Sequence, residues 1–420
     1  MKVTENLLKL SDACREKEGK LYVVGGAVRN HILGFDEADI DICGNLLPEQ
    51  IMEVATTCGF RSQIVNPKLG TVLITADKEQ YEYTTFRSEN YTTGHSPSEV
   101  QFIDDIKLDA KRRDFTINAM YYDIYTGNVL DFYNGRLDLR NQVIRTVETP
   151  DYVFASDGLR LLRLIRFASE LGFKIDKQTL KVAQNNIYML KDISAERKLK
   201  ELKLILLSDF RYGKANNCIK LFNKLNIYPN LFGLDLKIKN NAVAKRVFAT
   251  SADARYYAFC ALLLLTKYNF KYIPENQVEF DIHKIFGKTG LKDSNANLQE
   301  LMKMYFVLQQ FMFGKKISVM DLIRYNALNP KSKRCIGVFL KNQDIERNID
   351  ELRADGIPMN LDEVDITNLQ LKQFVEDEHI SKIKFMLFEM CIRGQISNTY
   401  HVLLDKALEI DAYLKELKSN

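Results

Sequence analysis

The sequence predicts a mixed α/β domain followed by a long helical region, and three observations support this fold class. Of the 420 residues, 46% are hydrophobic and 27% are charged, which is typical of globular domains with sizeable cores. Glycine and proline number only 20 and 8, too few for a fibrous or loop-dominated architecture. Short β-like runs are concentrated in the first 135 residues, whereas later segments have the 3.6-residue period of amphipathic helices.

The elements of the first domain follow one another in a definite order. An amphipathic helix that carries Leu7, Leu10 and Cys14 precedes a strand at Leu21–Val24. A Gly-Gly turn then leads into a short helix at Ala27–Leu33. Further strands are expected at Ile40–Cys43, Thr71–Thr75, Gln80–Phe86, Met120–Asp123 and Leu130–Phe132. We expect all of these strands to share one domain.

The helical region begins near Asp138, and prolines divide it. Breaks around Pro229, Pro274, Pro330 and Pro358 are expected to be loops between helical subdomains, because proline removes a backbone donor and ends helices. The predicted domains are a head at 1–135, a neck at 136–210, a body at 211–300 and a tail at 301–420.

Cysteine usage and hydropathy indicate the compartment. The seven cysteines are odd in number, scattered and never spaced as CxxC, which argues against a disulfide framework or a structural zinc site. No stretch approaches the roughly 20 apolar residues of a membrane span, and the chain starts without a signal-peptide pattern. We therefore expect a cytoplasmic protein with no membrane partner.

Positive charge is concentrated in one stretch of the chain. Between Lys191 and Arg246 there are 13 Lys and Arg against 5 Asp and Glu, although the whole chain carries only +4. Such a cluster is the electrostatic pattern of a nucleic-acid-binding surface. A solvated lysine-rich helical face explains this stretch equally well when it is taken alone.

Carboxylates follow the Gly-Gly turn at a spacing that suits metal ions. Asp39 and Asp41 lie in a strand-like run, whose period of two places both on one face. Glu82, on another predicted strand, could lie beside them, and such a triad can hold two Mg²⁺ ions about 4 Å apart. An isolated DxD is otherwise more often a solvent-exposed face.

Several segments resemble, in order, the motifs of one family. The order of Gly25–Arg29, Asp39–Asp41 and Glu82 is similar to that of polymerase-β-type nucleotidyltransferases. The run Lys111–Met120, KRRDFTINAM, closely resembles the RRDFTxNA motif of the class II tRNA nucleotidyltransferases, the CCA-adding enzymes, and of bacterial poly(A) polymerases. Further resemblances are at Asp131–Gly135, Asp157–Phe167 and Ala195–Leu202.

The resemblance implies a fold and a reaction. The fold is a polymerase-β-like head with a mixed sheet, followed by an all-α neck, body and tail, of which the tail binds tRNA. The reaction adds CCA to the 3′ end of tRNA from CTP and ATP, with Mg²⁺ held by Asp39 and Asp41 and with Glu82 as a third catalytic carboxylate. The implied nucleotide-binding residues are Gly25, Gly26, Arg29, Arg112, Arg113, Asp114, Asn118, Asp157, Arg160, Arg163 and Arg166.

The predicted helix after Ser156 has a polar side that could select the nucleotide. Asp157, Arg160, Arg163 and Arg166 recur every three residues and so share one side of the helix. Cytosine and adenine each present an amino donor beside a ring-nitrogen acceptor, which one carboxylate and one guanidinium can pair with. Guanine and uracil place a carbonyl where that amino group would be. Asp157 and Arg160 are therefore expected to select CTP and ATP, and the other two arginines to contact phosphates.

The chain departs from the family pattern at several positions. Ser156 and Asn30 stand where the family usually has Glu and Asp. In the loop at 91–97, Thr93 and His95 stand where Asp and Arg are common, although the length of the loop is retained. The retained length argues against an enzyme that adds only A, whereas the altered side chains leave a CC-adding enzyme open.

Two further alternatives remain beside the CC-adding enzyme. A bacterial poly(A) polymerase would share the head and neck. A non-catalytic RNA-binding relative would be expected to lack Asp39 or Asp41, and both are present. The oligomeric state does not follow from the sequence.

Overall fold

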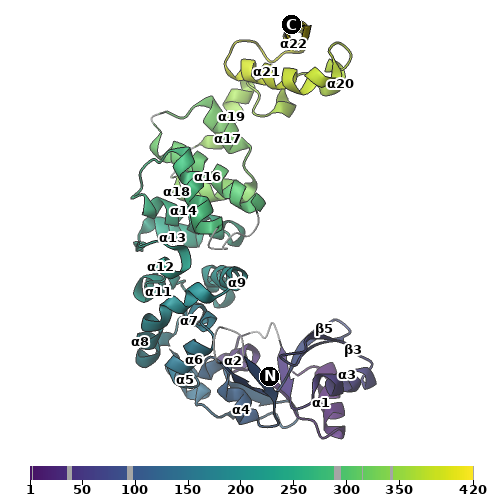
Figure 1. Cartoon of the computed structure of the whole chain (residues 1–420), viewed down its shortest axis with the longest axis vertical. Coiled ribbons are helices and arrows are strands. Elements are labelled where there is room, and N and C mark those ends of the chain that lie inside the picture. The colour runs from purple at the N-terminus through teal and green to yellow at the C-terminus, as the bar shows by residue number, and fades with distance from the viewer. Residues whose placement is uncertain are drawn as a thin grey trace. The chain divides into compact units, whose positions relative to one another are not determined.

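The computed structural model describes residues 1, 3–35, 40–91, 98–287, 295–314, 316–340 and 344–419 (Figure 1). The chain divides into two compact units. The first comprises Met1–Ile238, and the second comprises the described residues from Lys239 onward. The finer division predicted at residues 135, 210 and 300 stays a prediction.

The first unit is built on a mixed sheet, as the sequence predicts. Its described strands have the order β3-β4-β5-β2-β1-β8-β9. Strands β2 and β5 are parallel, and the other neighbours are antiparallel. The strands are β1 (Leu21–Val24), β2 (Asp41–Gly44), β3 (Arg61–Asn66), β4 (Thr71–Ala76), β5 (Glu79–Thr85), β8 (Met120–Asp123) and β9 (Val129–Asp131).

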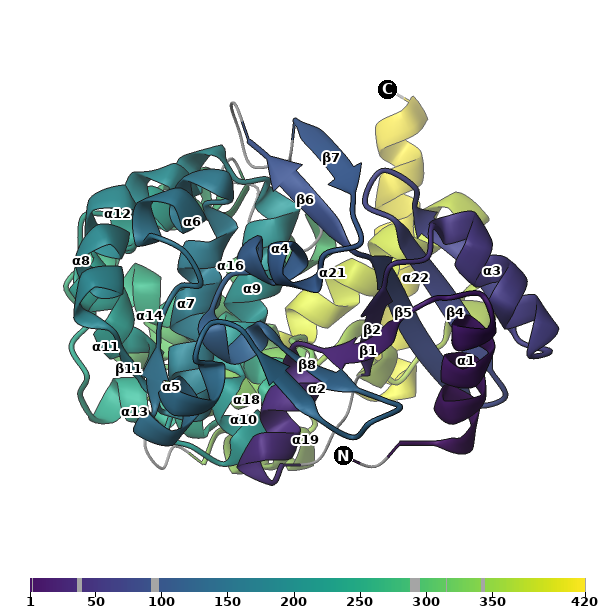
Figure 2. The same cartoon turned by 90° about the horizontal axis from the view of Figure 1, so that it is seen from below.

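Burial alternates along strand β5. In β5, Tyr81 and Tyr83 are buried and Glu82 is exposed, as expected for a strand with one face on the core. The helix α3 (Pro48–Thr57) packs on β3 and β4 and against the helix α1 (Glu5–Glu16) (Figure 2). Strand β3 was not predicted, because most of its side chains are exposed and the sequence has no apolar alternation there.

Two short ribbons accompany the sheet. Strands β6 (Arg87–Asn90) and β7 (Glu99–Phe102) form an antiparallel pair that the sequence did not predict. Strands β10 (Val143–Ile144) and β11 (Lys174–Ile175) form a parallel pair within the predicted all-α neck. Both members of this second pair have only two residues, too few for a visible alternation.

The helix α7 (Leu159–Leu171) is the centre of the helical part of the first unit. Its Leu161, Leu164 and Ile165 are fully buried, and it packs against α6, α9, α10 and α11. It ends at Gly172, whose φ of 69° suits glycine. The other helices are α2 (Gly26–Leu33), α4 (Ile106–Lys111), α5 (Gly135–Asn141), α6 (Pro150–Ser156), α8 (Lys177–Asn186), α9 (Ala195–Leu206), α10 (Ser208–Tyr212), α11 (Cys218–Leu225) and α12 (Tyr228–Phe232).

The described part of the second unit is helical. The helix α14 (Ala252–Lys267) is buried all round from Ala258 to Leu265, and it packs against α13 and α18. Two predicted breaks fall at helix starts, since Pro274 caps α15 and Pro330 begins α18. The other helices are α13 (Ala242–Ala249), α15 (Glu275–Ile282), α16 (Asn295–Phe313), α17 (Val319–Asn326), α18 (Pro330–Phe339), α19 (Ile345–Ala354), α20 (Asn368–Leu371), α21 (Ile380–Ile392) and α22 (Tyr400–Ser419).

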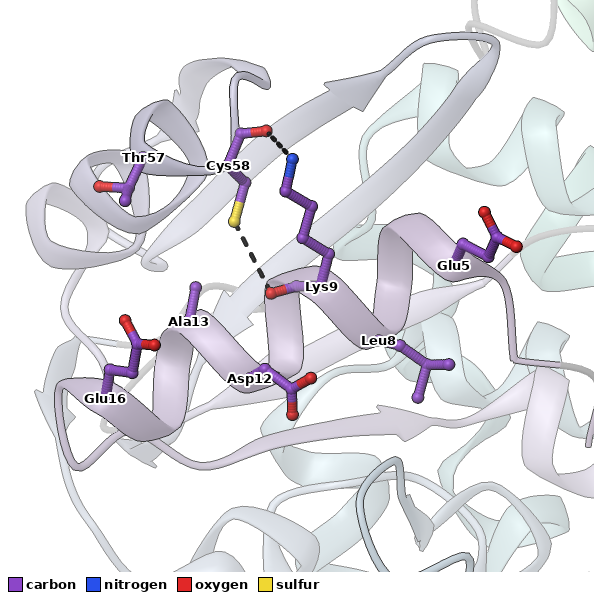
Figure 3. Close-up of a pocket in the computed structure, with 8 residues that line it drawn as sticks. All are labelled: Glu5, Leu8, Lys9, Asp12, Ala13, Glu16, Thr57 and Cys58. Carbon is purple, nitrogen blue, oxygen red and sulfur yellow. Dashed lines mark hydrogen bonds between the residues drawn. The ribbon is translucent and has the colours of Figure 1, made fainter.

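Among the described residues, none of the helices combines the length and the apolar character that crossing a membrane requires. The seven cysteines are all free and buried. One of them helps to fix α1, because Lys9 Nζ donates to the Cys58 carbonyl at 3.0 Å and Cys58 Sγ donates to the Lys9 carbonyl at 3.7 Å (Figure 3).

Candidate active site

A cavity of about 640 Å³ in the first unit gathers most of the predicted site residues. Side chains reach it from the sheet end of the head and from helices α7, α9 and α10. The predicted residues that line it are Gly25, Gly26, Arg29, Asp41, Arg112, Arg113, Asp114, Asn118, Asp157, Arg160, Arg163 and Arg166. A second cavity, of about 510 Å³ beside α1, is lined by none of the predicted residues (Figure 3).

The Gly-Gly turn brings the start of α2 to this cavity. Gly25 has a φ of 73°, a conformation that a side chain would strain, and it directly precedes α2. The first amide groups of a helix carry a partial positive charge and have no partner within the helix. The turn therefore offers backbone donors to an anion in the cavity.

The predicted carboxylates are only partly visible in the structure. Asp41 begins β2 with its side chain exposed at the cavity. Glu82 is the direct partner of Asp41 on the parallel strand β5, so the two residues lie side by side on one face of the sheet. Glu82 itself does not line the cavity. Asp39 lies outside the described residues, as do Thr93 and His95.

Arg112 and Arg113 are held by a carboxylate that the sequence reading did not single out. Asp109 is fully buried and accepts from Arg112 Nε at 2.9 Å, Arg113 Nη2 at 3.1 Å and the Tyr121 hydroxyl at 2.7 Å. Burial by itself raises the pKa of Asp109, but the charges of the two arginines outweigh it and hold that pKa well below its usual range. Both arginines are thus fixed before any ligand binds.

Asp114 and Asn118 connect arginines from the two sides of the cavity. Asp114 accepts from Arg163 Nε at 2.7 Å and from Asn118 Nδ2 at 3.2 Å. Asn118 Oδ1 in turn accepts from Arg29 Nη1 at 2.6 Å. Burial opposes the charge of Asp114, yet Arg163 and Arg160 keep its pKa below the usual value.

Asp157 and Arg160 stand at the start of α7, where protein groups orient both. Asp157 Oδ2 accepts from Arg197 Nη2 at 2.6 Å, and its Oδ1 accepts from the Leu159 amide at 3.0 Å. Arg160 donates to the Arg112 carbonyl at 2.7 Å. The two side chains are therefore held at the same end of one helix.

Arg166 has a different environment from the other predicted arginines. It lines the cavity but is only 7% exposed, and it pairs with Glu201 at 2.8 Å and with Glu170 at 3.4 Å. Its charge is therefore already compensated by protein. It also lies 4.3 Å from the centre of the Phe167 ring, where Arg29 and Arg163 each lie 5.2 Å away.

The lining is strongly cationic. Among the described residues it carries nine Arg and Lys side chains and four carboxylates. Three of the cations, Arg197, Lys200 and Arg211, were not among the predicted site residues. They lie in the basic stretch from Lys191 to Arg246, which was the available signal for them. A cavity with this excess attracts a polyanion such as a triphosphate.

Two segments of the chain match known protein families. Residues 21–145 match the poly A polymerase head domain, and residues 172–233 match the probable RNA and SrmB-binding site of polymerase A. Both matches are to parts of poly(A) polymerases. The first includes Asp41, Asp114 and Asn118, and the second begins directly after α7.

Curated proteins similar to this chain are CCA-adding enzymes. The CCA-adding enzyme of Bacillus licheniformis is 39% identical over 229 residues, which are 54% of this chain and 55% of the relative. That of Enterococcus faecalis is 42% identical over 193 residues, 46% of each chain. The chain thus spans about half the length of the curated relatives it matches.

Solved structures match the fold along nearly the whole chain. The Bacillus stearothermophilus CCA-adding enzyme in complex with CTP has a TM-score of 0.69 at 20% identity, covering 99% of this chain and 100% of that one. The Thermotoga maritima CCA-adding enzyme complexed with tRNA has a TM-score of 0.64 at 18% identity, covering 97% and 96%. The helical half therefore shares the fold of these enzymes, although its sequence gave little support for it.

A possible metal-binding group is present in the second unit as well. Ligand atoms of Glu376, Glu378 and His379 lie within 4.8 Å of one another, close enough to share an ion. Lys415 Nζ already lies 3.5 Å from Glu376 and 2.7 Å from Asp411, which is bound to His379. This group belongs to the second unit, whereas the cavity that gathers the predicted site residues belongs to the first.

Proposed function

We propose that this protein adds the 3′-terminal CCA to tRNA from CTP and ATP. The observation that carries the proposal is the single cavity in which Asp41, the Asp157 and Arg160 pair and nine cationic side chains meet. The names of its relatives agree with this proposal, since these are CCA-adding enzymes and some were solved with CTP, ATP or tRNA.

The proposed metal ligands are Asp39 and Asp41, with Glu82 beside Asp41 on the neighbouring strand. Carboxylate oxygens are the hard donors that Mg²⁺ prefers, and an exposed Asp41 at the cavity edge fits that requirement. Bound there, Mg²⁺ would lower the pKa of the tRNA 3′-hydroxyl and offset charge on the α-phosphate. The residues of the head would then keep this hydroxyl in line with the pyrophosphate that leaves.

The arginines of the head are the proposed triphosphate ligands. Gly26 at the start of α2 offers a backbone donor, and Arg29 and Arg112 offer guanidinium groups that fit phosphate oxygens. Asp109 fixes Arg112 and Arg113, and Asn118 fixes Arg29. Because these groups are oriented in advance, little ordering is needed when the nucleotide binds.

Asp157 and Arg160 are the proposed selectors of the base. Asp157 accepts hydrogen bonds from the protein at both carboxylate oxygens, and an ionised carboxylate offers about four acceptor sites in all. An amino group of cytosine or adenine can donate to it, whereas a carbonyl of uracil or guanine cannot. An unpaired polar contact of this kind costs about 1–3 kcal/mol.

The proposed RNA contact is the basic stretch from Lys191 to Arg246, together with the predicted tail at 301–420. In the helix α9, Lys200 is exposed at the cavity and Arg197 is half-buried beside it. Contacts of lysine and arginine with phosphates hold an RNA backbone without reading its sequence. We retain the cytoplasm as the proposed compartment, in accordance with seven free cysteines.

The decisive experiment uses tRNA transcripts that lack the last three, two or one nucleotides of the CCA end. Each is incubated with one nucleoside triphosphate at a time in the presence of Mg²⁺, with Asp41→Ala as the inactive control. We expect C, C and A to be added in order, with little use of UTP or GTP. Products that stop after the second C would indicate a CC-adding enzyme. Long A tails on unrelated RNA would indicate a poly(A) polymerase. No addition to any transcript would refute the proposal.

A further inference from the structure

Arg29 is a buried cation whose hydrogen-bond acceptors among the described residues are all neutral. Its side chain is 1% exposed. In the described part of the chain, Nη1 donates to Asn118 Oδ1 at 2.6 Å, and Nε and Nη2 donate to Asn30 Oδ1 at 3.2 and 3.0 Å. Burial lowers the pKa of Arg29. A buried charge without a hydrogen-bonded counter-charge is costly, so the site favours an anionic ligand that supplies one.

The fourth hydrogen bond of Arg29 comes from a distant part of the chain. The hydroxyl of Tyr212, in α10, accepts from Arg29 Nη2 at 3.0 Å across 183 residues of sequence. The same hydroxyl donates to Asn30 Oδ1 at 2.9 Å. The three side chains therefore form a closed triangle in which every bond restricts the other two.

The ring of Tyr212 is anchored independently of its hydroxyl. It stacks on Phe35 with centroids 4.5 Å apart and an angle of 26° between the ring planes. Phe35 lies just after α2, which carries Arg29 and Asn30, so Tyr212 contacts both this helix and the segment that follows it. Removal of the hydroxyl alone would leave the stacking, and with it the packing of α10, in place.

The neutral side chain of Asn30 determines whether the charge of Arg29 is paired within the protein. An aspartate there would hold the guanidinium by a paired carboxylate and would compensate its charge. With asparagine there, the charge of Arg29 remains available to pair with an anionic ligand. The guanidinium is also held less tightly, because a neutral acceptor forms a weaker hydrogen bond than a carboxylate. A second neutral acceptor, the Tyr212 hydroxyl, adds a hydrogen bond that helps to hold the guanidinium in place.

We propose that Tyr212, together with Asn30, is a positioning residue that orients Arg29 toward the phosphates of the bound nucleotide without placing a hydrogen-bonded carboxylate on it. This inference rests on the proposed function, in which Arg29 binds the triphosphate. It assigns a role to α10, a helix that contributes no predicted site residue.

The test begins with Tyr212→Phe, which removes the hydroxyl and keeps the ring. We expect KM for CTP and ATP to rise about fivefold, which corresponds to slightly less than the free energy of one hydrogen bond to a charged group. The value of kcat and KM for tRNA should change less than twofold, since neither the metal ligands nor the RNA surface is altered. Tyr188→Phe is the matched control, because Tyr188 is 53% exposed and lies outside the cavity. An unchanged nucleotide KM in Tyr212→Phe would overturn the proposal.

A double-mutant cycle separates positioning from a merely structural role. In Asn30→Asp, a carboxylate holds Arg29 directly, so adding Tyr212→Phe should change the nucleotide KM less than twofold. The same fivefold change in both backgrounds would mean that Tyr212 acts independently of the Arg29 orientation, and would overturn the proposal.

A binding measurement keeps this test apart from that of the proposed function. If the wild type extends no tRNA, the proposed function has failed, and inorganic tripolyphosphate then replaces the nucleotide. Calorimetric titration should still give about fivefold weaker binding for Tyr212→Phe than for the wild type and Tyr188→Phe. Equal affinities of all three proteins would overturn the role of Tyr212.

Discussion

Replacement of Asp109 by asparagine is expected to destabilise the first unit and to weaken nucleotide binding together. The carboxylate is fully buried and bonds Arg112, Arg113, the Tyr121 hydroxyl and, at 3.2 Å, the Arg87 amide. The two arginine side chains are only 13% and 16% exposed. Asparagine preserves the shape of the side chain but removes the one negative charge that both guanidinium groups share.

The magnitude follows from what each arginine retains. Arg112 still has Glu89 at 3.4 Å, whereas Arg113 keeps only the neutral Tyr121 hydroxyl among its described hydrogen-bond partners. Removing one partner of a buried ion pair costs about 3–5 kcal/mol, and the contact with Glu89 places the expected loss near the lower end, about 3 kcal/mol. Nucleotide KM should rise as well, since Arg112 and Arg113 line the cavity.

The pH dependence of this loss has a definite sign. The pKa of Asp109 is lower in the folded protein than in the unfolded chain, so the ionised carboxylate stabilises the fold above the unfolded pKa, near 4. That contribution declines as pH falls through the folded pKa. The difference between wild type and Asp109→Asn should therefore be constant between pH 7 and 5 and shrink below about pH 4.

Amide hydrogen exchange measures the predicted loss of stability in the strands next to Asp109. Amides of the central strands β1 and β8 should exchange on the order of a hundredfold faster in Asp109→Asn at pH 7. Asp104→Asn is the matched control, because Asp104 forms an exposed pair with Lys20 and its loss should cost less than about 1 kcal/mol. Equal protection of β1 and β8 in wild type and Asp109→Asn would refute the reasoning from the buried carboxylate.

Two further predictions test the proposed chemistry. Asp41→Ala should lower nucleotide transfer more than about tenfold, because metal stabilisation is worth several kcal/mol, while tRNA affinity measured by filter binding stays within a few-fold; a mutant that keeps more than a tenth of wild-type turnover would show that Asp41 is not a metal ligand. Asp157→Ala or Arg160→Ala should slow the use of CTP and ATP and relax discrimination against UTP and GTP in single-nucleotide assays; an unchanged preference in both mutants would end the template hypothesis for α7.

Much of the head can be predicted from its sequence because its strands and turns are encoded by patterns over a few neighbouring residues. The strand at Thr71–Ala76 and the turn at Gly25 are encoded by alternation and by glycine over a few residues. Asp109 also had a local signal, since it stands three and four residues before Arg112 and Arg113, the spacing of helical ion pairs. Strand β3 had none, because an exposed edge strand needs no apolar face.

The contacts that complete the candidate site lie beyond such signals. Tyr212 contacts Arg29 because α10 packs next to α2 in the folded chain. No pattern of residue spacing within either segment predicts this contact. The pairing of Asp41 with Glu82 is an intermediate case. Period-two alternation places each carboxylate on one face of its own strand, but their adjacency depends on a parallel register between β2 and β5, which the chain reaches through α3, β3 and β4. A slip of one residue in that register would put Glu82 on the opposite face from Asp41. The carboxylate site therefore depends on the buried residues Ile42, Tyr81 and Tyr83 as well as on the acidic residues, because their burial disfavours that one-residue slip.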